Sequence, residues 1–292
     1  MNFKIAEHIF SLSIPERYSN LLGAYRPFEA PHSGEVLYRV EVVEGVSYEV
    51  TETLLEDVEL SDEGMVRVNI YRTTAGLLYN ITLPRSSEVD AQLHIVESLA
   101  TISLNDRCNH QQALFAFNNA MILSYITYTV HHNTLLLHAS AILKDGCAHL
   151  FIGKSGTGKS THSRMWQESF ADAELLNDDH PIVRYHEGGE VIAYGSPWSG
   201  KRHCYRNLSA PLRAIVRIKR AEYNRLTRLK AIRGYASVMT SCSGFQWSRS
   251  LLNAKAASLE SVITRVGCYE MECLPNNEAA QCCYESLCLE RL

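Results

Sequence analysis

The sequence lacks an excess of charge of either sign. Its 292 residues include 28 Lys and Arg against 32 Asp and Glu, which gives a formal net charge of -4. Such a chain produces no global field that would attract a nucleic acid or an anionic membrane. We therefore expect no nucleic-acid partner and no membrane partner, and any site for a phosphate group has to be local.

The sequence also lacks the cysteine spacing of a zinc ribbon or a thiol redox motif. Its nine cysteines are odd in number and include no C-x-x-C pair, so we expect buried, reduced thiols. The first 14 residues contain one lysine, Lys4, and no small-residue cleavage site, so a secretory signal is not expected. The longest apolar stretch, 113–130, is broken by Asn118, Asn119, Ser124 and Thr127, which predicts a core helix and not a membrane span. These absences together favour a cytoplasmic protein.

What the sequence does contain is enough apolar residues for a large core. Hydrophobic residues make up 46% of the chain and charged residues 21%, and the length reaches the limit of a single core, which favours two domains. Strand-like runs at 36–43, 48–54, 65–71 and 76–83 are separated by turn residues, and 109–130 has helical spacing. We predict an N-terminal domain over residues 1–130, a mainly antiparallel β-sheet with one helix, used as an accessory or substrate-recognition domain.

The second domain, 131–292, has the mixed pattern of an α/β (α+β) fold. Two apolar runs, 134–143 and 147–152, flank the turn residues Lys144-Asp145-Gly146 and predict a β-hairpin. The remaining expected elements are strands at 173–176, 212–218, 225–229 and 266–273, a hairpin over 181–194, and helices at 161–170, 230–241 and 278–287.

The second strand of the first hairpin runs into a glycine-rich segment. Gly153 to Ser160 fits G-x-x-x-x-G-K-[ST], the P-loop or Walker A pattern, at every fixed position, and lies between a predicted strand and a predicted helix. Glycines let backbone N–H groups turn toward phosphates, and a helix N-terminus adds a favourable dipole. A chance match in a glycine-rich turn is the alternative. We predict that this segment binds ATP through Gly153, Lys154, Ser155, Gly156, Thr157, Gly158, Lys159, Ser160 and Thr161. Lys159 would reach the β/γ-phosphates, and the Ser160 hydroxyl would be a ligand of Mg²⁺.

Two adjacent carboxylates, Asp178 and Asp179, follow a short apolar run about 20 residues beyond this segment. One carboxylate can hold the metal while the other takes the proton of an acceptor hydroxyl. Like charges so close raise one of the two pKa values, which suits a base. The alternative is a solvated turn before Pro181. His138 lies on the hairpin, and we expect it to approach Asp178 and orient it, although a lone histidine is more often a core residue.

These features together resemble the HPr serine kinase/phosphorylase family, distantly related to phosphoenolpyruvate carboxykinases. The resemblance rests on His138, the hairpin, the loop Gly153 to Ser160 and the doublet Asp178-Asp179, and covers roughly residues 134 to 219. It implies a P-loop catalytic domain with a mixed sheet, in which Lys159 and Ser160 bind ATP and Mg²⁺ and Asp179 helps to hold the metal. It also implies that Asp178 is the base toward a serine hydroxyl, supported by His138.

The segment from Gly195 to Arg202 departs from the substrate-contacting signature of the HPr enzymes. It resembles the same segment in HPr-kinase-like proteins of unassigned substrate, a group that includes kinases of small precursor peptides. Two glycines flank two serines, and two cations end the segment, which predicts a mobile loop that closes over the triphosphate. Lys201 would then stabilise charge on the transferred phosphoryl group. The alternative is a surface turn with Trp198 packed beneath it.

Our first hypothesis is an ATP- and Mg²⁺-dependent kinase that transfers the γ-phosphoryl group to a hydroxyl, serine of a peptide or small protein. One alternative keeps the same site and phosphorylates a small metabolite. Another is a non-catalytic, ATP-gated module in which the N-terminal sheet recruits a partner. The sequence leaves the acceptor, the reverse reaction and homo-oligomerisation open.

Overall fold

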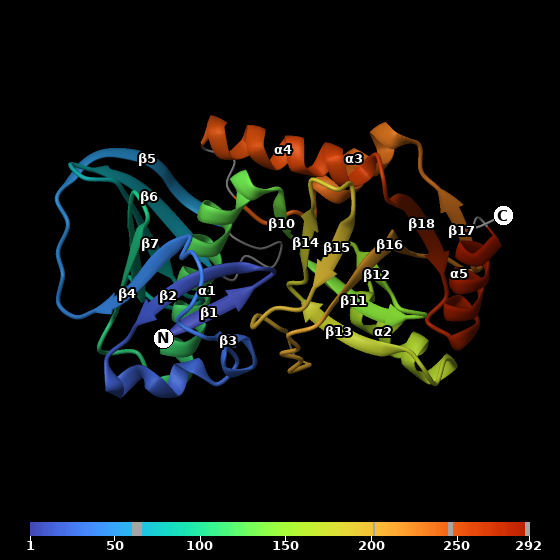
Figure 1. The fold of residues 1–292 in the computed structure, drawn as a ribbon, viewed down its shortest axis with the longest axis horizontal. Coiled ribbons are helices and arrows are strands. Elements are labelled where there is room, and N and C mark those ends of the chain that lie inside the picture. Colours follow the sequence, from blue (N-terminus) through green and yellow to red (C-terminus); the bar gives the residue numbers. More distant parts are fainter. Residues whose placement is uncertain (60–65, 201, 245–247, 290–292) are drawn as a thin grey trace. The chain divides into compact units, whose positions relative to one another are not determined.

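A computed structural model describes residues 1–59, 66–200, 202–244 and 248–289. The chain forms two compact units, and each is described by itself. The first unit comprises Met1–Thr129 with Gly244–Arg249, and the second comprises Val130–Ser243 with Ser250–Leu292. Figure 1 colours them from blue to green and from green to red along the chain.

The first unit is built on a nine-stranded sheet in the order β3-β1-β2-β4-β9-β8-β7-β6-β5. Its strands are β1 (Asn2–Ile5), β2 (His8–Ser13), β3 (Glu29–Ala30), β4 (Tyr38–Val43), β5 (Val50–Glu59), β6 (Arg67–Thr73), β7 (Leu77–Thr82), β8 (Ala91–Val96) and β9 (Leu99–Leu104). Strand β4 pairs in parallel with β2 and β9, and the other pairs are antiparallel. The predicted mainly antiparallel sheet is therefore confirmed. Two short 3₁₀ helices, η1 (Glu16–Leu22) and η2 (Arg26–Phe28), lie between β2 and β3.

Helix α1 (His110–Thr129) packs on strands β7, β8 and β9 of this sheet. It begins at Asn109, whose carboxamide accepts a hydrogen bond from Gln112 N, while Gln112 accepts one from Asn109 N, both at 3.0 Å. Among the described residues, His110–His132 is the one helical stretch long and apolar enough to cross a membrane, and 61% of its apolar window is buried inside the protein. That burial agrees with the predicted core helix.

The second unit holds a mixed sheet in the order β10-β14-β15-β16-β12-β11-β13, with β18 beside β16 and β17 beside β18. Its strands are β10 (Thr134–Leu136), β11 (Ala139–Lys144), β12 (Cys147–Ile152), β13 (Glu174–Asp179), β14 (Ile182–Tyr185), β15 (Val191–Tyr194), β16 (Ser209–Arg220), β17 (Arg225–Arg228) and β18 (Gly267–Cys273). Strands β12, β16 and β18 are parallel, and the other pairs are antiparallel. The 3₁₀ turn η3 (Val130–His132) precedes β10.

Helices cover both faces of this sheet. Helices α3 (Ala231–Met239) and α4 (Arg249–Ile263) pack on one face, and α2 (Lys159–Ser169) and α5 (Asn277–Leu289) pack on the other. Successive side chains of β16 point to opposite faces of the sheet and so belong to different cores. Ile215 packs with α3 and α4, while Val216 packs with α2 and α5. The second unit is therefore an α/β layer structure, as expected.

The chain departs from the expected hairpin at one point that concerns the site. The run 134–143 is not one strand: β10 pairs with β14, whereas β11 pairs with β12 and β13. The break falls at Leu137 and His138, whose backbone N–H groups donate to Pro181 O (3.1 Å) and Ser241 O (2.7 Å). Neither N–H group takes part in the hydrogen bonds between β11 and its neighbouring strands, so His138 lies at a bend between two strands.

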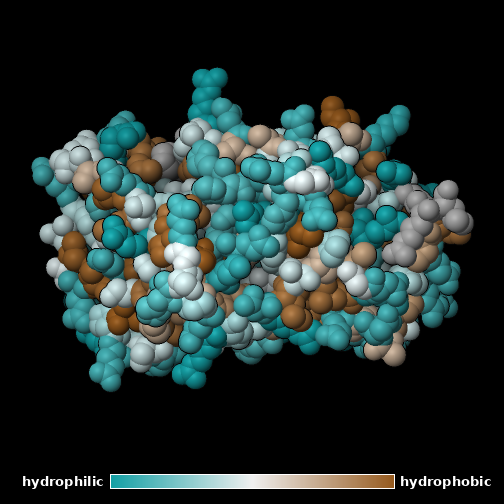
Figure 2. Space-filling model, viewed as in Figure 1, coloured by the Kyte–Doolittle hydropathy of each residue, from teal (hydrophilic) through white to brown (hydrophobic). Residues whose placement is uncertain are grey.

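All nine cysteines are free thiols; Cys268, Cys273 and Cys283 are buried, whereas the other six are half-buried, so the expected burial holds for three of them. On the face drawn in Figure 2 the apolar side chains form small separate groups among hydrophilic ones. The large hydrophobic side chains with more than half of their surface exposed are Met1, Ile232 and Leu289 among the described residues.

Candidate active site

The glycine-rich segment has the strand, loop and helix order that the sequence predicts. Strand β12 ends at Ile152, and α2 begins at Lys159 with Gly158 as its N-cap. Gly156 and Gly158 have φ of 74° and 111°, which a residue with a side chain rarely adopts. A Cβ on Gly153 would lie 2.7 Å from Thr157 Oγ1. The glycines are therefore required by the shape of the loop itself.

Three carbonyl groups of this loop accept hydrogen bonds from side chains. Lys159 Nζ donates to Gly153 O at 3.0 Å, Thr157 Oγ1 donates to Lys154 O at 2.7 Å, and Arg220 donates to Gly156 O. Lys159 is buried, whereas Ser160, in the same first turn of α2, is exposed. The hydroxyl that was predicted to face a metal is accessible to solvent.

Strand register brings the loop and the aspartates to one edge of the sheet. Ala139 of β11 lies opposite Ile152 of β12 on one side and opposite Asp179 of β13 on the other. Gly153 and Asp179 thus leave the sheet two strands apart, a span of about 10 Å between backbones. The hairpin therefore brings together the two segments that the sequence singled out.

Asp179 lies between two imidazoles. His138 Nε2 is 3.3 Å from Asp179 Oδ1, and His180 Nδ1 is 3.2 Å from Asp179 Oδ2, with the two rings 18° from parallel. Burial by itself raises the pKa of Asp179, but His180, His138 and Lys159 outweigh it and hold the pKa below its ordinary value. The backbone of Asp179 has a φ of 141°, a strained value for a residue with a Cβ, and such strain is common at functional positions.

Asp178 occupies a different environment from its neighbour. It lies opposite Ser140, which accepts a hydrogen bond from Ser163 of α2 at 2.6 Å, so its side chain is on the α2 face. Only 4% of Asp178 is exposed, and no side-chain hydrogen bond or ion pair holds its carboxylate among the residues that the structure describes. The expected contact of His138 with Asp178 is corrected here: the bend at His138 directs the imidazole to Asp179.

Asn177, which sequence reasoning passed over, fixes the segment from Gly195 to Gly200 beside the aspartates. Its buried Nδ2 lies 3.3 Å from Ser196 O, 3.2 Å from Ser196 Oγ and 3.1 Å from Trp198 O, and its Oδ1 accepts from His180 N at 2.9 Å. The available signal was an amide residue directly after the apolar pair Leu175-Leu176, because an amide that continues a buried strand needs hydrogen-bond partners.

The segment is also bound to Asp178 through its backbone. The Asp178 carbonyl accepts from Gly200 N at 2.6 Å and from Ser199 Oγ at 3.2 Å, and Trp198 is 3% exposed. The buried Trp198 agrees with the alternative in which it packs beneath a turn, but the turn is not at the surface, because Gly195 to Trp198 are all buried. These contacts tether the segment that was expected to be mobile. Arg202 donates to Gln167 of α2 at 2.5 Å. Lys201, the predicted cation for the transferred group, lies outside the described residues.

The residues at this edge suit a magnesium ion by their chemistry. Carboxylate and hydroxyl oxygens, as in Asp178, Asp179 and Ser160, are the hard donors that Mg²⁺ prefers, and substrate phosphates and waters usually complete its shell. Among the described residues no group of three His, Cys, Asp or Glu side chains is arranged to hold a metal ion.

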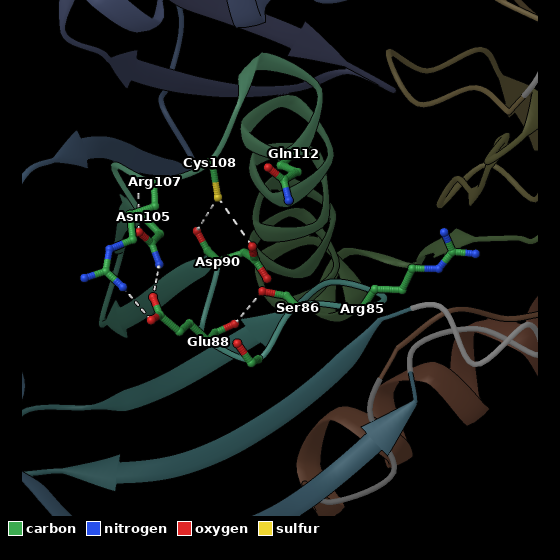
Figure 3. A pocket seen from close by; sticks show the side chains of 9 residues that line it. Arg85, Ser86, Glu88, Asp90, Asn105, Arg107, Cys108 and Gln112 are labelled. Atoms are coloured by element: carbon green, nitrogen blue, oxygen red, sulfur yellow. Dashed lines mark hydrogen bonds and ion pairs between the residues drawn. The ribbon is translucent and has the colours of Figure 1, made fainter.

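A cavity of about 230 Å³ lies in the first unit. Figure 3 shows its side chains: Arg85, Ser86, Ser87, Glu88, Asp90, Asn105, Arg107, Cys108 and Gln112. Three of its four charged side chains already have partners, because Arg107 pairs with Glu88 at 2.5 Å and Asp90 accepts from Leu83 N at 2.8 Å. These contacts stabilise the turns that precede α1. The candidate active site therefore remains the edge of the second sheet, where the glycine-rich loop and the aspartates lie.

No family model and no curated protein matches this sequence. Among solved structures the chain is similar to the HPr(Ser) kinase/phosphatase from Coxiella burnetii, with 9% sequence identity and a TM-score of 0.34. The match covers 54% of this chain and 99% of that chain. A TM-score of this size supports no conclusion about function, so the function is inferred from the residues of the site.

Proposed function

We propose that the protein is an ATP- and Mg²⁺-dependent kinase that transfers the γ-phosphoryl group to a hydroxyl, with serine of a peptide or small protein as the first candidate acceptor. The observation that carries the proposal is the placement of an ionised carboxylate, Asp179, level with the start of a phosphate loop and held by two imidazoles. Phosphoryl transfer depends mainly on positioning and charge neutralisation, which such a site supplies.

The geometry favours a division of labour between the two aspartates that differs from the sequence-based one. Asp179 is one-third exposed, so it is the carboxylate that an acceptor hydroxyl can reach, even though its pKa is lowered and not raised as the paired carboxylates predict for a base. Asp178 lies on the α2 face, the side on which α2 carries Ser160, and these two side chains would hold the metal. Bound Mg²⁺ would neutralise charge on the β- and γ-phosphates.

The chain's own residues would prepare the site in three ways. Backbone N–H groups of the loop and the Lys159 ammonium would bind the β/γ-phosphates. His138 and His180 would fix both oxygens of Asp179, so that one lone pair faces the acceptor. The tethered turn 195–200 would form a wall beside the aspartates. The cytoplasmic location, the recognition role of the first unit and the role of Lys201 belong to the same proposal.

The test compares Asp179→Asn, Asp178→Asn and Lys159→Ala with the wild type, in ATP binding by calorimetry and in transfer of labelled phosphate to serine peptides. We expect Lys159→Ala to lose ATP binding, and Asp179→Asn to bind ATP within about threefold of wild type while transfer falls by at least about 100-fold. Asp178→Asn should instead shift the Mg²⁺ dependence of transfer to higher concentration.

Four outcomes would contradict this assignment. A wild type that binds no ATP would exclude the kinase, and full transfer by Asp179→Asn would exclude that residue as the base. If Asp178→Asn abolished transfer with unchanged Mg²⁺ dependence, the sequence-based order of the two roles would be correct. Tight ATP binding without ADP release in the presence of any acceptor would favour the non-catalytic module.

A further inference from the structure

Strand β16 ends in two consecutive cations, Lys219 and Arg220, that lie on opposite faces of the sheet. Lys219 is in register with Glu272 of β18 and forms an ion pair with it at 3.0 Å. Arg220 shares its face with Ile218, which packs in the core formed with α2 and α5. The alternation of the strand thus directs Arg220 to the side on which the phosphate loop enters α2.

Arg220 also differs from its basic neighbours in its partners. Lys219 and Arg225 both pair with Glu272, the latter at 2.5 Å, so their charges are compensated. The Arg220 guanidinium donates to the carbonyl of Gly156, and no carboxylate pairs with it within the described ranges. One uncompensated positive charge therefore lies against the tip of the phosphate loop.

The contact with Gly156 matters because a carbonyl oxygen repels a phosphate. Gly153 O and Lys154 O are bound by donors from within the segment, Lys159 and Thr157, whereas Gly156 O is bound from another strand. Gly156 has a φ of 74°, and glycine allows its peptide group to rotate at small cost. The orientation of this peptide therefore depends on an outside anchor, and Arg220 is placed to provide it.

We propose that Arg220 is a positioning residue of the nucleotide site: it holds the Gly156 carbonyl away from the bound phosphates and adds its charge to the attraction of the loop for the β-phosphate of ATP or ADP. This inference rests on the proposed function. Backbone amides of such loops contact the α- and β-phosphates, so the effect should be large for ADP and ATP and small for AMP.

The test measures binding of ATP, ADP and AMP, each with Mg²⁺, to the full chain by calorimetry. Arg220→Met removes the donor and the charge, Arg220→Gln keeps a donor, and Arg220→Lys keeps the charge. Lys219→Gln and Arg225→Gln are matched controls, because they remove charges from the same sheet edge that are already paired.

We expect Arg220→Met to weaken ATP and ADP binding by about tenfold, the size of one hydrogen bond from a charged donor, with AMP changed less than about twofold. Arg220→Lys should recover most of the loss. The Kd of the wild type should rise more steeply with KCl than that of Arg220→Gln, a difference that a merely structural role would not produce. The two controls should bind ATP like the wild type.

The outcomes separate this inference from the function on which it rests. A wild type that binds no ATP overturns the proposed function and this inference with it. If the wild type binds ATP and Arg220→Met binds it within twofold, the inference is wrong and the proposed function stands. Equal losses of ATP affinity for Arg220→Met and Arg225→Gln would likewise overturn it, since the loss would then come from the total positive charge of this edge and not from Arg220 in particular. Should Arg220→Met fail to fold by circular dichroism, Arg220→Gln and Arg220→Lys decide the result through the same salt and nucleotide series.

Discussion

Replacing Asn177 by alanine should destabilise the second unit and release the turn beside the aspartates. The side chain is fully buried, and its Nδ2 faces three acceptors while its Oδ1 accepts from His180 N. An amide nitrogen has two hydrogens, so at most two of the three acceptors are satisfied at once, and the side chain makes three hydrogen bonds in total. At about 1 kcal/mol each, Asn177→Ala should lower the free energy of unfolding by about 3 kcal/mol.

Urea titration followed by tryptophan fluorescence and circular dichroism measures this change. Trp198 lies within the released turn, so its fluorescence should change at lower urea concentration than the far-ultraviolet signal in the variant. Asn253→Ala, an exposed amide on α4 of the same unit, is the control and should change stability by less than about 0.5 kcal/mol. A loss below about 1 kcal/mol for Asn177→Ala, or an equal loss for both variants, would show that the amide does not hold the turn.

Two further predictions concern the same unit. Burial lowers the pKa of His162 from 6.5 to about 3, so between these values the unfolded chain holds one proton more than the folded one, and stability falls as the pH falls. We expect this group to lower the free energy of unfolding by about 2 kcal/mol between pH 8 and pH 5. His162→Gln should remove that pH dependence, because glutamine can still accept from Trp166 Nε1. Urea titrations at both pH values measure it, with the exposed His131→Gln as control, and an equal pH dependence of stability in the two variants would contradict the prediction. Gly195→Ala places a Cβ 2.0 Å from Arg206 O and should lower the free energy of unfolding by about 2 kcal/mol or more. Gly188→Ala, whose Cβ would have no atom within 4 Å, should lower it by less than about 0.5 kcal/mol. Equal melting temperatures for the two variants would refute the packing argument.

Much of the second unit could be predicted because its signals are local. The motif at 153–160, the hairpin over 181–194 and the strand at 267–273 depend on turn glycines and apolar periodicity, which neighbouring residues determine. Helix α4 was not predicted, and neither were strands β1, β2, β3, β8 and β9. Strand β3 has two residues and β1 has four, too short for an alternating pattern to emerge from a single sequence.

The sequence predicts the members of the candidate site, and their roles stay predictions, but it does not predict their contacts. The spacing of the loop and the doublet grouped Lys159, Ser160, Asp178 and Asp179, and the register across Ala139 places the loop and the doublet at one edge of the sheet. Which aspartate His138 contacts could not be predicted, because the bend at Leu137 and His138 is stabilised by backbone hydrogen bonds to Pro181 and Ser241, far along the chain.

The order of strand, glycine-rich loop and helix around residues 153–160 follows from the local sequence, since a glycine-rich turn between a strand and a helix needs only its own residues. Tertiary structure decided the rest of the site. It placed His180 and His138 on either side of Asp179, turned Asp178 toward α2, tied the 195–200 turn to Asn177 and put Arg220 against Gly156. Apart from the contact of Asp179 with His180, the next residue in the chain, these contacts join segments that are distant in the sequence. Their meeting depends on strand register, which is set by the pairing of whole strands and not by any one stretch of residues.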